Sequence, residues 1–471
     1  MQLLIFGLYF AVVFFIGWYS LRATRDDRDY WIAGGKLGWL LGGSTMAATH
    51  TSAGTFIGTI GVIYSVGWSF TWLIFSIPLA YWFMAAVLAP RFTRVKQLTL
   101  PAFIESRYYS KGARGIAAVI VLIASVVYVQ AQIVAGGLVA NIVFGLPTTQ
   151  GMVIFTLILL AYTVVGGMIA VVYTDFVQMV IMVLGVLITL PLALRHLDGL
   201  DNLFLYVQAL QPFAFTWEGM PGTLLFTMGL AFFLGSVATP EKVVRLYAMK
   251  DMPTIRRAIF FTIVIVTVIN ILVFVIALTS RVFFPLLPTG DLAMPVVARA
   301  VLPTFLGTLM LAAITSAMMS TVDSLLLVAG SALSEDLYHG LLDPTASPRR
   351  RLWVARVGIL VVGVVPLGLI LSGVGRGELV QFIVVLFSAL MAASFFMPVV
   401  GGVMWKRATR EGAIAAMVGG VTTTMGWKLY GLEAIDPVLP GFLCSALLLV
   451  TVSLLTPPPP SSATAPYFEK T

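Results

Sequence analysis

Long apolar runs, separated by short polar segments, dominate this chain from one end to the other. A helix that crosses a bilayer needs about 20 mostly apolar residues, because each residue adds about 1.5 Å to a path of about 30 Å. The runs predict about thirteen such helices, roughly at residues 2–21, 38–65, 67–90, 115–144, 149–167, 173–194, 222–240, 258–280, 303–332, 354–373, 378–404, 411–430 and 438–456. They are too uniformly apolar for the alternating strands of a β-barrel. The pattern predicts an all-α polytopic membrane protein.

Composition narrows the class of protein further. Of the 471 residues, 59% are hydrophobic and 10% are charged. Soluble domains carry about 25% charged residues, so this chain is neither a soluble enzyme nor a soluble nucleic-acid-binding domain. A single cysteine and three scattered histidines exclude an intramolecular disulfide and a metal centre built from Cys or His.

The net charge of +8 comes from Lys and Arg residues that gather in alternate connecting segments. Basic loops favour the cytoplasmic side of a membrane. If the N-terminus lies outside and the C-terminus in the cytoplasm, most of the 28 Lys and Arg residues fall on the cytoplasmic side. We therefore expect a multi-pass protein of the cell (inner) membrane whose basic residues contact lipid headgroups. No nucleic-acid partner is expected, and no protein partner is implied.

Polar residues interrupt the second apolar run at mid-membrane depth. The segment from Thr45 to Thr55 contains five hydroxyl side chains, a histidine and a glycine. A helix broken here would expose backbone carbonyls and half-helix dipole ends, and carbonyl and hydroxyl oxygens suit a small hard cation such as Na⁺. The alternative is an unbroken helix whose Ser and Thr side chains bond back to the preceding turn.

A second interruption, GSVATP over 235–240, falls in the seventh apolar run. Two interrupted spans in corresponding halves of a chain are typical of a transporter binding site. Because these spans are five apart, the sequence predicts two five-helix repeats of inverted topology. The expected organisation is an extra N-terminal helix over 1–22, repeats over 38–195 and 222–405, two C-terminal helices over 411–456, and a disordered tail over 457–471.

The ninth apolar run carries a stripe of small and polar residues. On a helix Ala317, Ser320, Thr321 and Ser324 share one face. This stripe indicates either an oxygen cage opposite the broken second run or a packing face between helices. Asp323 is an intramembrane carboxylate, with a functional role or a helix-end salt bridge as alternatives. Asp175 either caps the sixth predicted helix or assists the passage of a cation.

These segments resemble the sodium:solute symporter family, whose members include sodium-coupled proline, pantothenate, sialic acid and glucose carriers. The resemblance is carried by four stretches: AATHTSAGTFIG over 47–58, GGMIAVVYTDFVQ over 166–178, RLYAMKD over 245–251 and AMMSTVDSLLLVAGSALSEDLY over 317–338. It implies a LeuT-type five-plus-five inverted-repeat fold, Na⁺ as the coupling ion and sodium-driven uptake of a solute.

The resemblance also implies particular ligands for sodium. By motif position the carbonyls fall on Ala48, Thr51 and Ala317, and the hydroxyls on Ser320 and Thr321. Some members have a second sodium site, for which Asp175 and Ser324 match in type. Here Asp323 stands where those members have a hydroxyl, so these three residues are candidates for a second site or an ion exit path. Proline carriers have an aspartate at the position of His50, and its absence argues mildly against a proline carrier.

The substrate is expected at the membrane midplane, between the broken helices and the fourth and eleventh predicted helices. Candidate contacts are His50, Ser52, Thr55, Tyr128, Gln132, Phe233, Ser236, Ser388 and Ser394. No buried basic residue is expected near this cavity. Hydroxyls, amides and aromatic rings suit a small polar organic solute, such as an organic acid, a vitamin or an amino acid.

The expected function is therefore secondary active transport, in which a sodium-coupled symporter imports the solute by alternating access. Proton coupling through His50 or Asp175 is the main alternative. An ion channel would show rings of pore-lining charge or repeated filter loops, and neither is found. An intramembrane enzyme would need convergent catalytic groups, which the sequence does not show, so no enzymatic activity is expected.

Overall fold

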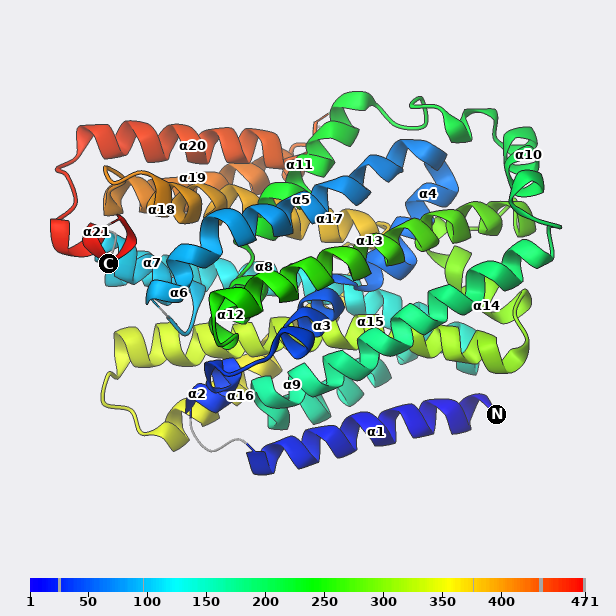
Figure 1. Cartoon of the computed structure of the whole chain (residues 1–471), viewed down its shortest axis with the longest axis horizontal. Helices are drawn as coiled ribbons and strands as arrows, with labels where there is room; N and C mark the ends of the chain where they lie inside the picture. Colours follow the sequence, from blue (N-terminus) through cyan, green and yellow to red (C-terminus); the bar gives the residue numbers. More distant parts are fainter. Residues whose placement is uncertain (24–26, 96, 376, 432–434, 469–471) are drawn as a thin grey trace.

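The computed structural model describes the whole chain except residues 24–26, 96, 376, 432–434 and 469–471. The described part is almost entirely helical, and its extended pairing amounts to one isolated bridge between Leu37 and Met249. Within it, ten helical segments are long and apolar enough to cross a membrane. The prediction of an all-α polytopic membrane protein is thus confirmed (Figure 1).

The helices fall into two sets. The long or membrane-depth helices are α1 Gln2–Ala23, α3 Trp39–His50, α4 Ile60–Val66, α5 Leu73–Phe83, α8 Lys111–Phe144, α9 Thr148–Arg195, α11 Gly222–Ala238, α13 Met252–Phe283, α15 Thr304–Ser331, α16 Pro348–Leu371, α17 Val380–Met391, α19 Arg410–Leu429 and α20 Val438–Leu455. The short ones are α2 Asp27–Ile32, α6 Ala89–Val95, α7 Leu100–Tyr108, α10 Leu200–Leu210, α12 Pro240–Ala248, α14 Ala293–Ala300, α18 Gly402–Met404 and α21 Ser461–Phe468.

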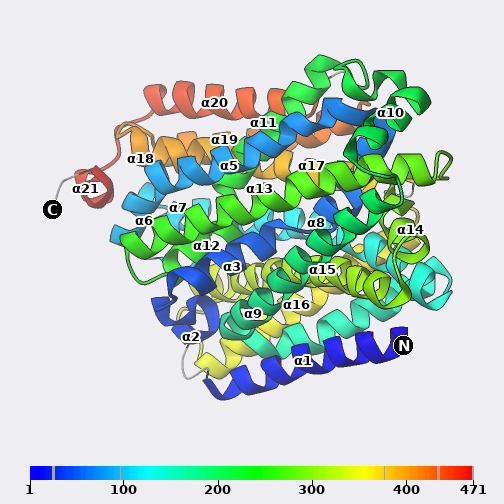
Figure 2. The same ribbon diagram turned by 45° about the vertical axis from the view of Figure 1, so that its right-hand side comes forward.

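The long helices run side by side between two ends of the molecule, and the chain termini lie at opposite ends (Figures 1 and 2). The short helices α2, α6, α7, α12 and α21 gather at the end that holds the C-terminus. The short helices α10 and α14 lie at the other end. This is the arrangement of a helical bundle that spans a membrane, with the connecting segments at its two ends.

Burial follows the pattern expected in lipid. The peripheral helices α1 and α20 expose apolar side chains such as Leu3, Phe15 and Leu447. In contrast, α15 is enclosed by α3, α8, α9 and α16, and its most apolar stretch is completely buried. The small and polar residues of α15 therefore lie inside the bundle, where they can contact only protein or the contents of a cavity.

The helix α9 is kinked at Gly167, where φ is 64°. A side chain there would place its Cβ 2.7 Å from the ring of Tyr30, so both the backbone angle and the space require glycine. The sequence analysis expected two helices separated by a longer connection. Because the helix resumes directly after Gly167, Asp175 lies about two turns inside it, and the expectation that Asp175 caps a helix is wrong.

The expectation of a disordered tail is wrong for its central part. Residues Ser461–Phe468 form α21, which packs against α6 and α7. The buried Tyr467 donates a hydrogen bond to Ser106 Oγ at 2.9 Å, and its ring contacts Phe103. The helix α20 ends just before the four prolines, but Tyr467 and Phe468 beyond them pack against the hydrophobic core. Residues 469–471 of the predicted tail lie outside the described residues.

Three basic residues that were expected at lipid headgroups are buried instead. Arg107 is fully buried, and its guanidinium donates to the carbonyls of Gly402, the first residue of α18, and of Trp405, which follows that helix. Lys242 and Arg245, on α12, are also buried. A count of charges in predicted loops cannot separate such residues from surface ones, because short helices fold back into the bundle.

Candidate sodium and solute sites

The first predicted break in a helix is confirmed. The helix α3 ends at His50, Thr51 is extended with φ −77° and ψ 99°, and a π-helical turn begins at Gly54. Polar side chains satisfy the freed backbone, as Ser52 Oγ accepts from Gly54 N at 2.9 Å and Gln132 Oε1 accepts from Ala53 N at 3.0 Å. The broken segment is thereby held in place from within and from α8.

The second predicted break is also confirmed. The helix α11 ends at Ala238, Thr239 is extended with φ −74° and ψ 132°, and α12 begins at Pro240. Proline has no N–H to continue the ladder of α11, and it suits the first turn of a new helix. The helix α12 contacts both α3 and α15, so the two breaks lie in one region of the bundle.

Oxygen atoms of α3 and α15 converge beside the first break. Ser320 Oγ donates to the carbonyls of Ala48 and Ala317 at 3.0 and 3.1 Å. Thr321 Oγ1 lies 3.1 Å from the carbonyls of both Thr49 and Ala317. We name these three carbonyls and two hydroxyls the oxygen cage.

The cage has the chemistry that a small monovalent cation requires. All five oxygen atoms are uncharged, and the hydroxyls of Ser320 and Thr321 can turn their protons away and present lone pairs to a cation. Unwound carbonyls at a broken helix are a recurring ligand set for Na⁺ in transporters. Among the described residues, no group of three or more His, Cys, Asp and Glu side chains could hold a metal ion.

Four of the five expected sodium ligands are drawn together. Ala48, Ala317, Ser320 and Thr321 are all members of the cage, whereas Thr51 lies at the break itself and is buried. The carbonyl that Thr321 meets on α3 belongs to Thr49, which the sequence analysis missed. Regular helical spacing would not bring two adjacent carbonyls to the same partner helix. Ala48 and Thr49 both do so because they lie in the last turn of α3, where the helix unwinds.

The expected second sodium site is a cluster that also contains an arginine. Asp175 Oδ2 accepts from Thr45 Oγ1 and lies 3.2 Å from Arg245 Nη2. The same Nη2 donates to Ser324 Oγ at 2.6 Å, and Ser324 Oγ lies 3.0 Å from Thr49 Oγ1. Asp175 and Ser324 are thus brought together as expected, but around a guanidinium that the sequence analysis had placed at the membrane surface.

Asp323 has a hydrogen-bond partner outside that cluster. Its Oδ1 accepts from Thr163 Oγ1 of α9 at 2.6 Å, and its side chain is fully buried. It projects from α15 in a different direction from Ser324, as neighbours on a helix do. A role for Asp323 beside Asp175 and Ser324, in a second sodium site or an ion exit path, stays a prediction.

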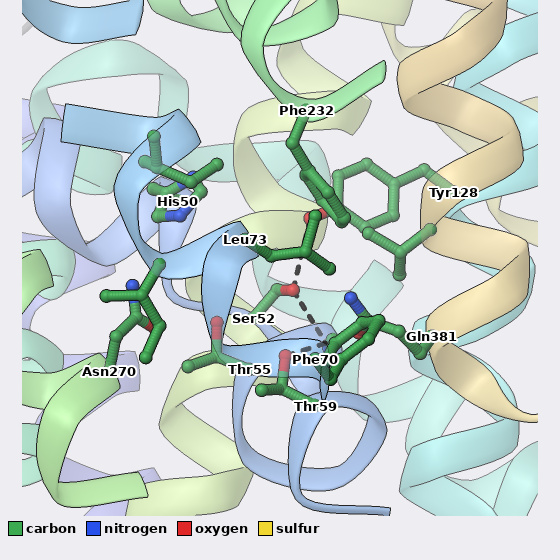
Figure 3. Close-up of a pocket in the computed structure, with 14 residues that line it drawn as sticks. His50, Ser52, Thr55, Thr59, Phe70, Leu73, Tyr128, Phe232, Asn270 and Gln381 are labelled. Carbon is green, nitrogen blue, oxygen red and sulfur yellow. Dashed lines mark hydrogen bonds between the residues drawn. The ribbon is translucent and has the colours of Figure 1, made fainter. Parts of the chain in front are cut away.

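A cavity opens beside the first break, and Figure 3 shows the residues around it. Tyr128 and Phe232 lie on one side, His50 and Asn270 lie on the other, and Ser52 lies between them. Tyr128 donates a hydrogen bond to Ser52 Oγ at 3.1 Å. Thus four of the predicted substrate contacts line this upper cavity, namely His50, Ser52, Thr55 and Tyr128.

A smaller lower cavity adjoins the upper one and shares His50, Tyr128, Phe232 and Val384 with it. Two further predicted contacts, Ser236 and Ser388, line it. So does Lys242, whose side chain is 5% exposed. The expectation that no buried basic residue lies near the cavity is therefore wrong, because α12 folds back beneath the second break.

The other three predicted substrate contacts have different surroundings. Gln132 binds the backbone of the broken segment through Ala53 N. Phe233 packs against Phe83 and Phe396, while its neighbour Phe232 faces the cavities. Ser394 is buried in a π-helical stretch over 392–401 and lines neither cavity.

Sequence reasoning also missed several residues of the upper cavity. Asn270 is the one amide in a long apolar run, so its type alone could have drawn attention to it. Gln381 and Thr59 also line the cavity, and their side chains lie 3.5 Å apart across it. Their positions near helix ends gave no such signal.

The model of the sodium:solute symporter family matches residues 30–420, which is most of the chain. The chain belongs to the sodium:solute symporter family. Sodium is the coupling ion of this symporter, which is a transporter and not an enzyme.

Sequence relatives and solved structures agree with this family. The osmoregulated proline transporter of Bacillus subtilis is 27% identical, over 96% of this chain and 94% of its own. A sodium/proline symporter of Staphylococcus aureus is 28% identical, over 96% of this chain and 92% of its own. The chain of a Na⁺-coupled sialic acid symporter superposes with a TM-score of 0.81 at 19% identity, over 97% of this chain and 98% of its own. Mhp1, of the nucleobase-cation-symport-1 family, gives 0.59 at 14% identity, over 94% and 99%. The LeuT-type fold is thus confirmed.

Proposed function

We propose that this symporter binds its coupling sodium ion in the oxygen cage and a small polar organic solute in the adjoining cavities, and that it carries both into the cell by alternating access. The observation that carries this proposal is the meeting of Ser320 and Thr321 with the carbonyls of Ala48, Thr49 and Ala317. The cage joins a broken helix to an unbroken one. A bound cation would therefore hold together two elements that can move apart.

The geometry also provides a route for coupling. The last turn of α3 supplies Ala48 and Thr49 to the cage, and the next residues, His50 and Ser52, line the cavity. An ion that fixes this turn fixes the cavity wall, so sodium and solute favour the same arrangement. Coupling of this kind requires each ligand to bind one state better than the other, and the effect is reciprocal.

The cluster of Asp175 and Ser324 is proposed to carry no second sodium ion in this arrangement. Arg245 Nη2 contacts both side chains, so a fixed positive charge stands among the oxygens that a second cation would need. A cation and a guanidinium in one buried cluster repel each other. The contacts of Arg245 with Asp175 and Ser324 instead hold α9, α12 and α15 together.

The orientation proposed for the chain puts its N-terminus outside and its C-terminus in the cytoplasm. The face that holds α2, α6, α7, α12 and α21 would then be cytoplasmic. The basic sequence RRR at 349–351, at the start of α16, supports this choice, since positive charge favours the cytoplasmic side.

The choice between sodium and proton coupling is tested in proteoliposomes of the purified chain. An inward Na⁺ gradient should drive accumulation of a labelled solute, and an inward proton gradient without Na⁺ should not. A panel of organic acids, amino acids and vitamins in the same assay identifies the solute. Accumulation driven by protons alone would overturn the proposal.

A further inference from the structure

The lower cavity contains a buried ammonium group. Lys242 Nζ donates to Ser236 Oγ at 2.9 Å and lies 5.7 Å from the centre of the Tyr81 ring. Ser236 belongs to the last turn of α11, just before the second break. The ammonium is therefore held at the junction of the two half-helices by a hydroxyl and an aromatic face, neither of which neutralises it.

One carboxylate, that of the adjacent Glu241, shares the lower cavity with this ammonium and attracts it electrostatically. Lys242 is only 5% exposed, and among the described residues its ammonium forms no salt bridge. Asp175 is paired with Arg245. Glu241 lines the same cavity, and its Oε2 has no hydrogen-bond partner within the described part of the chain. Buried charged groups that make no direct ion-pair contact are costly, and a ligand that brings complementary charge between them would stabilise both.

We infer that Lys242 receives the carboxylate of the transported solute, so that the substrate class of this symporter is a small carboxylate. This inference rests on the proposed function, because it assigns the solute of that transporter. The carboxylate would accept from Nζ and from the nearby hydroxyls of Ser236 and Ser388. The remainder of the solute would extend past His50 and Tyr128 into the upper cavity.

The upper cavity fits an uncharged remainder. Its walls combine apolar rings, such as Phe70 and Phe232, with the neutral amides of Asn270 and Gln381. A monocarboxylate and a zwitterionic amino acid both carry the required group. Only the amino acid also carries an ammonium, which could donate a hydrogen bond to Oε2 of Glu241.

The test uses the purified full-length chain in proteoliposomes with an imposed Na⁺ gradient. The probes are labelled L-lactate and L-proline, and glycerol serves as the neutral probe. The wild-type chain should accumulate a carboxylate probe but not glycerol. Lys242→Gln should raise the KM for that probe at least about tenfold, as expected for the loss of a charge-assisted hydrogen bond. Lys242→Arg should recover part of the loss.

Two controls separate this inference from the proposed function. Lys250→Gln removes an exposed ammonium from the segment after α12 and should leave the KM unchanged. Sodium-dependent thermal stabilisation of Lys242→Gln in detergent, without solute, should match wild type. If sodium does not stabilise even the wild-type chain, the sodium site is refuted instead of the role of Lys242.

Glu241→Gln distinguishes the two kinds of carboxylate. It should impair proline uptake much more than lactate uptake if the solute is a zwitterion, and should spare lactate uptake if the solute is a simple anion. The inference is overturned if Lys242→Gln transports its carboxylate with a KM within about twofold of wild type. It is also overturned if wild type accumulates neither carboxylate probe, or accumulates glycerol.

Discussion

Tyr128 and Ser52 show how a single contact can serve both the fold and the cavity. Their hydrogen bond of 3.1 Å joins α8 to the unwound segment after α3, and both side chains line the upper cavity. Residue type and depth in the membrane were enough to select both of them from the sequence. The sequence could not predict that these two side chains bond to each other, because that depends on where α8 passes the break after α3.

The hydroxyl of Tyr128 should matter more for the solute than for stability. Tyr128→Phe keeps the ring, which packs 4.4 Å from that of Phe387, and removes only the bond to Ser52. Because this bond orients Ser52 in the cavity wall, we expect its loss to weaken solute binding by about 1 kcal/mol, which raises the KM for solute about fivefold. Uptake kinetics measure this, with Tyr173→Phe at an exposed position as the control. An unchanged KM in Tyr128→Phe would contradict the placement of the solute beside this residue.

Asp291 predicts a dependence of stability on pH. It lies in the connection before α14, and its Oδ2 accepts from Val380 N at the start of α17. Burial raises its pKa from 3.8 to about 6, against the opposing effect of that backbone hydrogen bond. Since the folded state disfavours the charged form, the wild type loses stability as pH rises from about 4 to about 6. Above that range the loss is complete.

Asp291→Asn removes this dependence and keeps an oxygen acceptor for Val380 N. The melting temperature of the variant in detergent should therefore exceed that of wild type at pH 8 by a few degrees, and the difference should shrink at pH 5. An offset of equal size at both pH values, or a variant less stable at pH 8, would contradict the assignment.

At the scale of elements, the two helix breaks were predictable and the kink in α9 was not. Ser, Thr, Gly and Pro together at mid-membrane depth indicate a break, because Gly and Pro interrupt the helix and the hydroxyls can bond to the freed backbone. Gly167 gave a weaker signal, because one residue with a positive φ kinks the helix and leaves regular helix on both sides. Its sequence neighbours suggested a longer connection, and Asp175 was consequently assigned to a helix end.

Gly167→Ala should be strongly destabilising. The substitution forces a Cβ into the left-handed region and within 2.7 Å of the Tyr30 ring. The combined cost is of the order of 1–3 kcal/mol, which should lower the melting temperature by several degrees. Gly368→Ala is a matched control, because it lies within α16 with open space around its Cβ. Equal melting temperatures for the two variants would contradict the role given to the kink.

At the scale of the whole molecule, the fold and the family followed from the sequence, and the buried ionic network did not. The order of apolar runs fixes a helical bundle, and four motifs identify the family. Whether Arg245 or Lys242 faces lipid headgroups or the bundle interior depends on how α12 folds back after Thr239. Local pattern carries no information on that, because each residue taken alone reads as part of a basic loop.

The network around Arg245 predicts the stoichiometry of transport. With a guanidinium already among Asp175 and Ser324, one sodium ion should move with each solute. Uptake as a function of Na⁺ concentration should follow a Hill coefficient near 1. A coefficient near 2 in wild type would show that Arg245 leaves the cluster and that a second ion takes its place.

The most direct test of the sodium site measures sodium binding without any solute. Wild type in detergent should melt at a higher temperature in NaCl than in KCl of equal ionic strength, since a ligand of the folded state stabilises it. Thr321→Ala should lose this difference. Thr315→Ala should keep it, because the one hydrogen bond of the Thr315 hydroxyl within the described residues goes to the Leu311 carbonyl of its own helix. A Thr321→Ala variant that keeps the full sodium-dependent shift would contradict the cage.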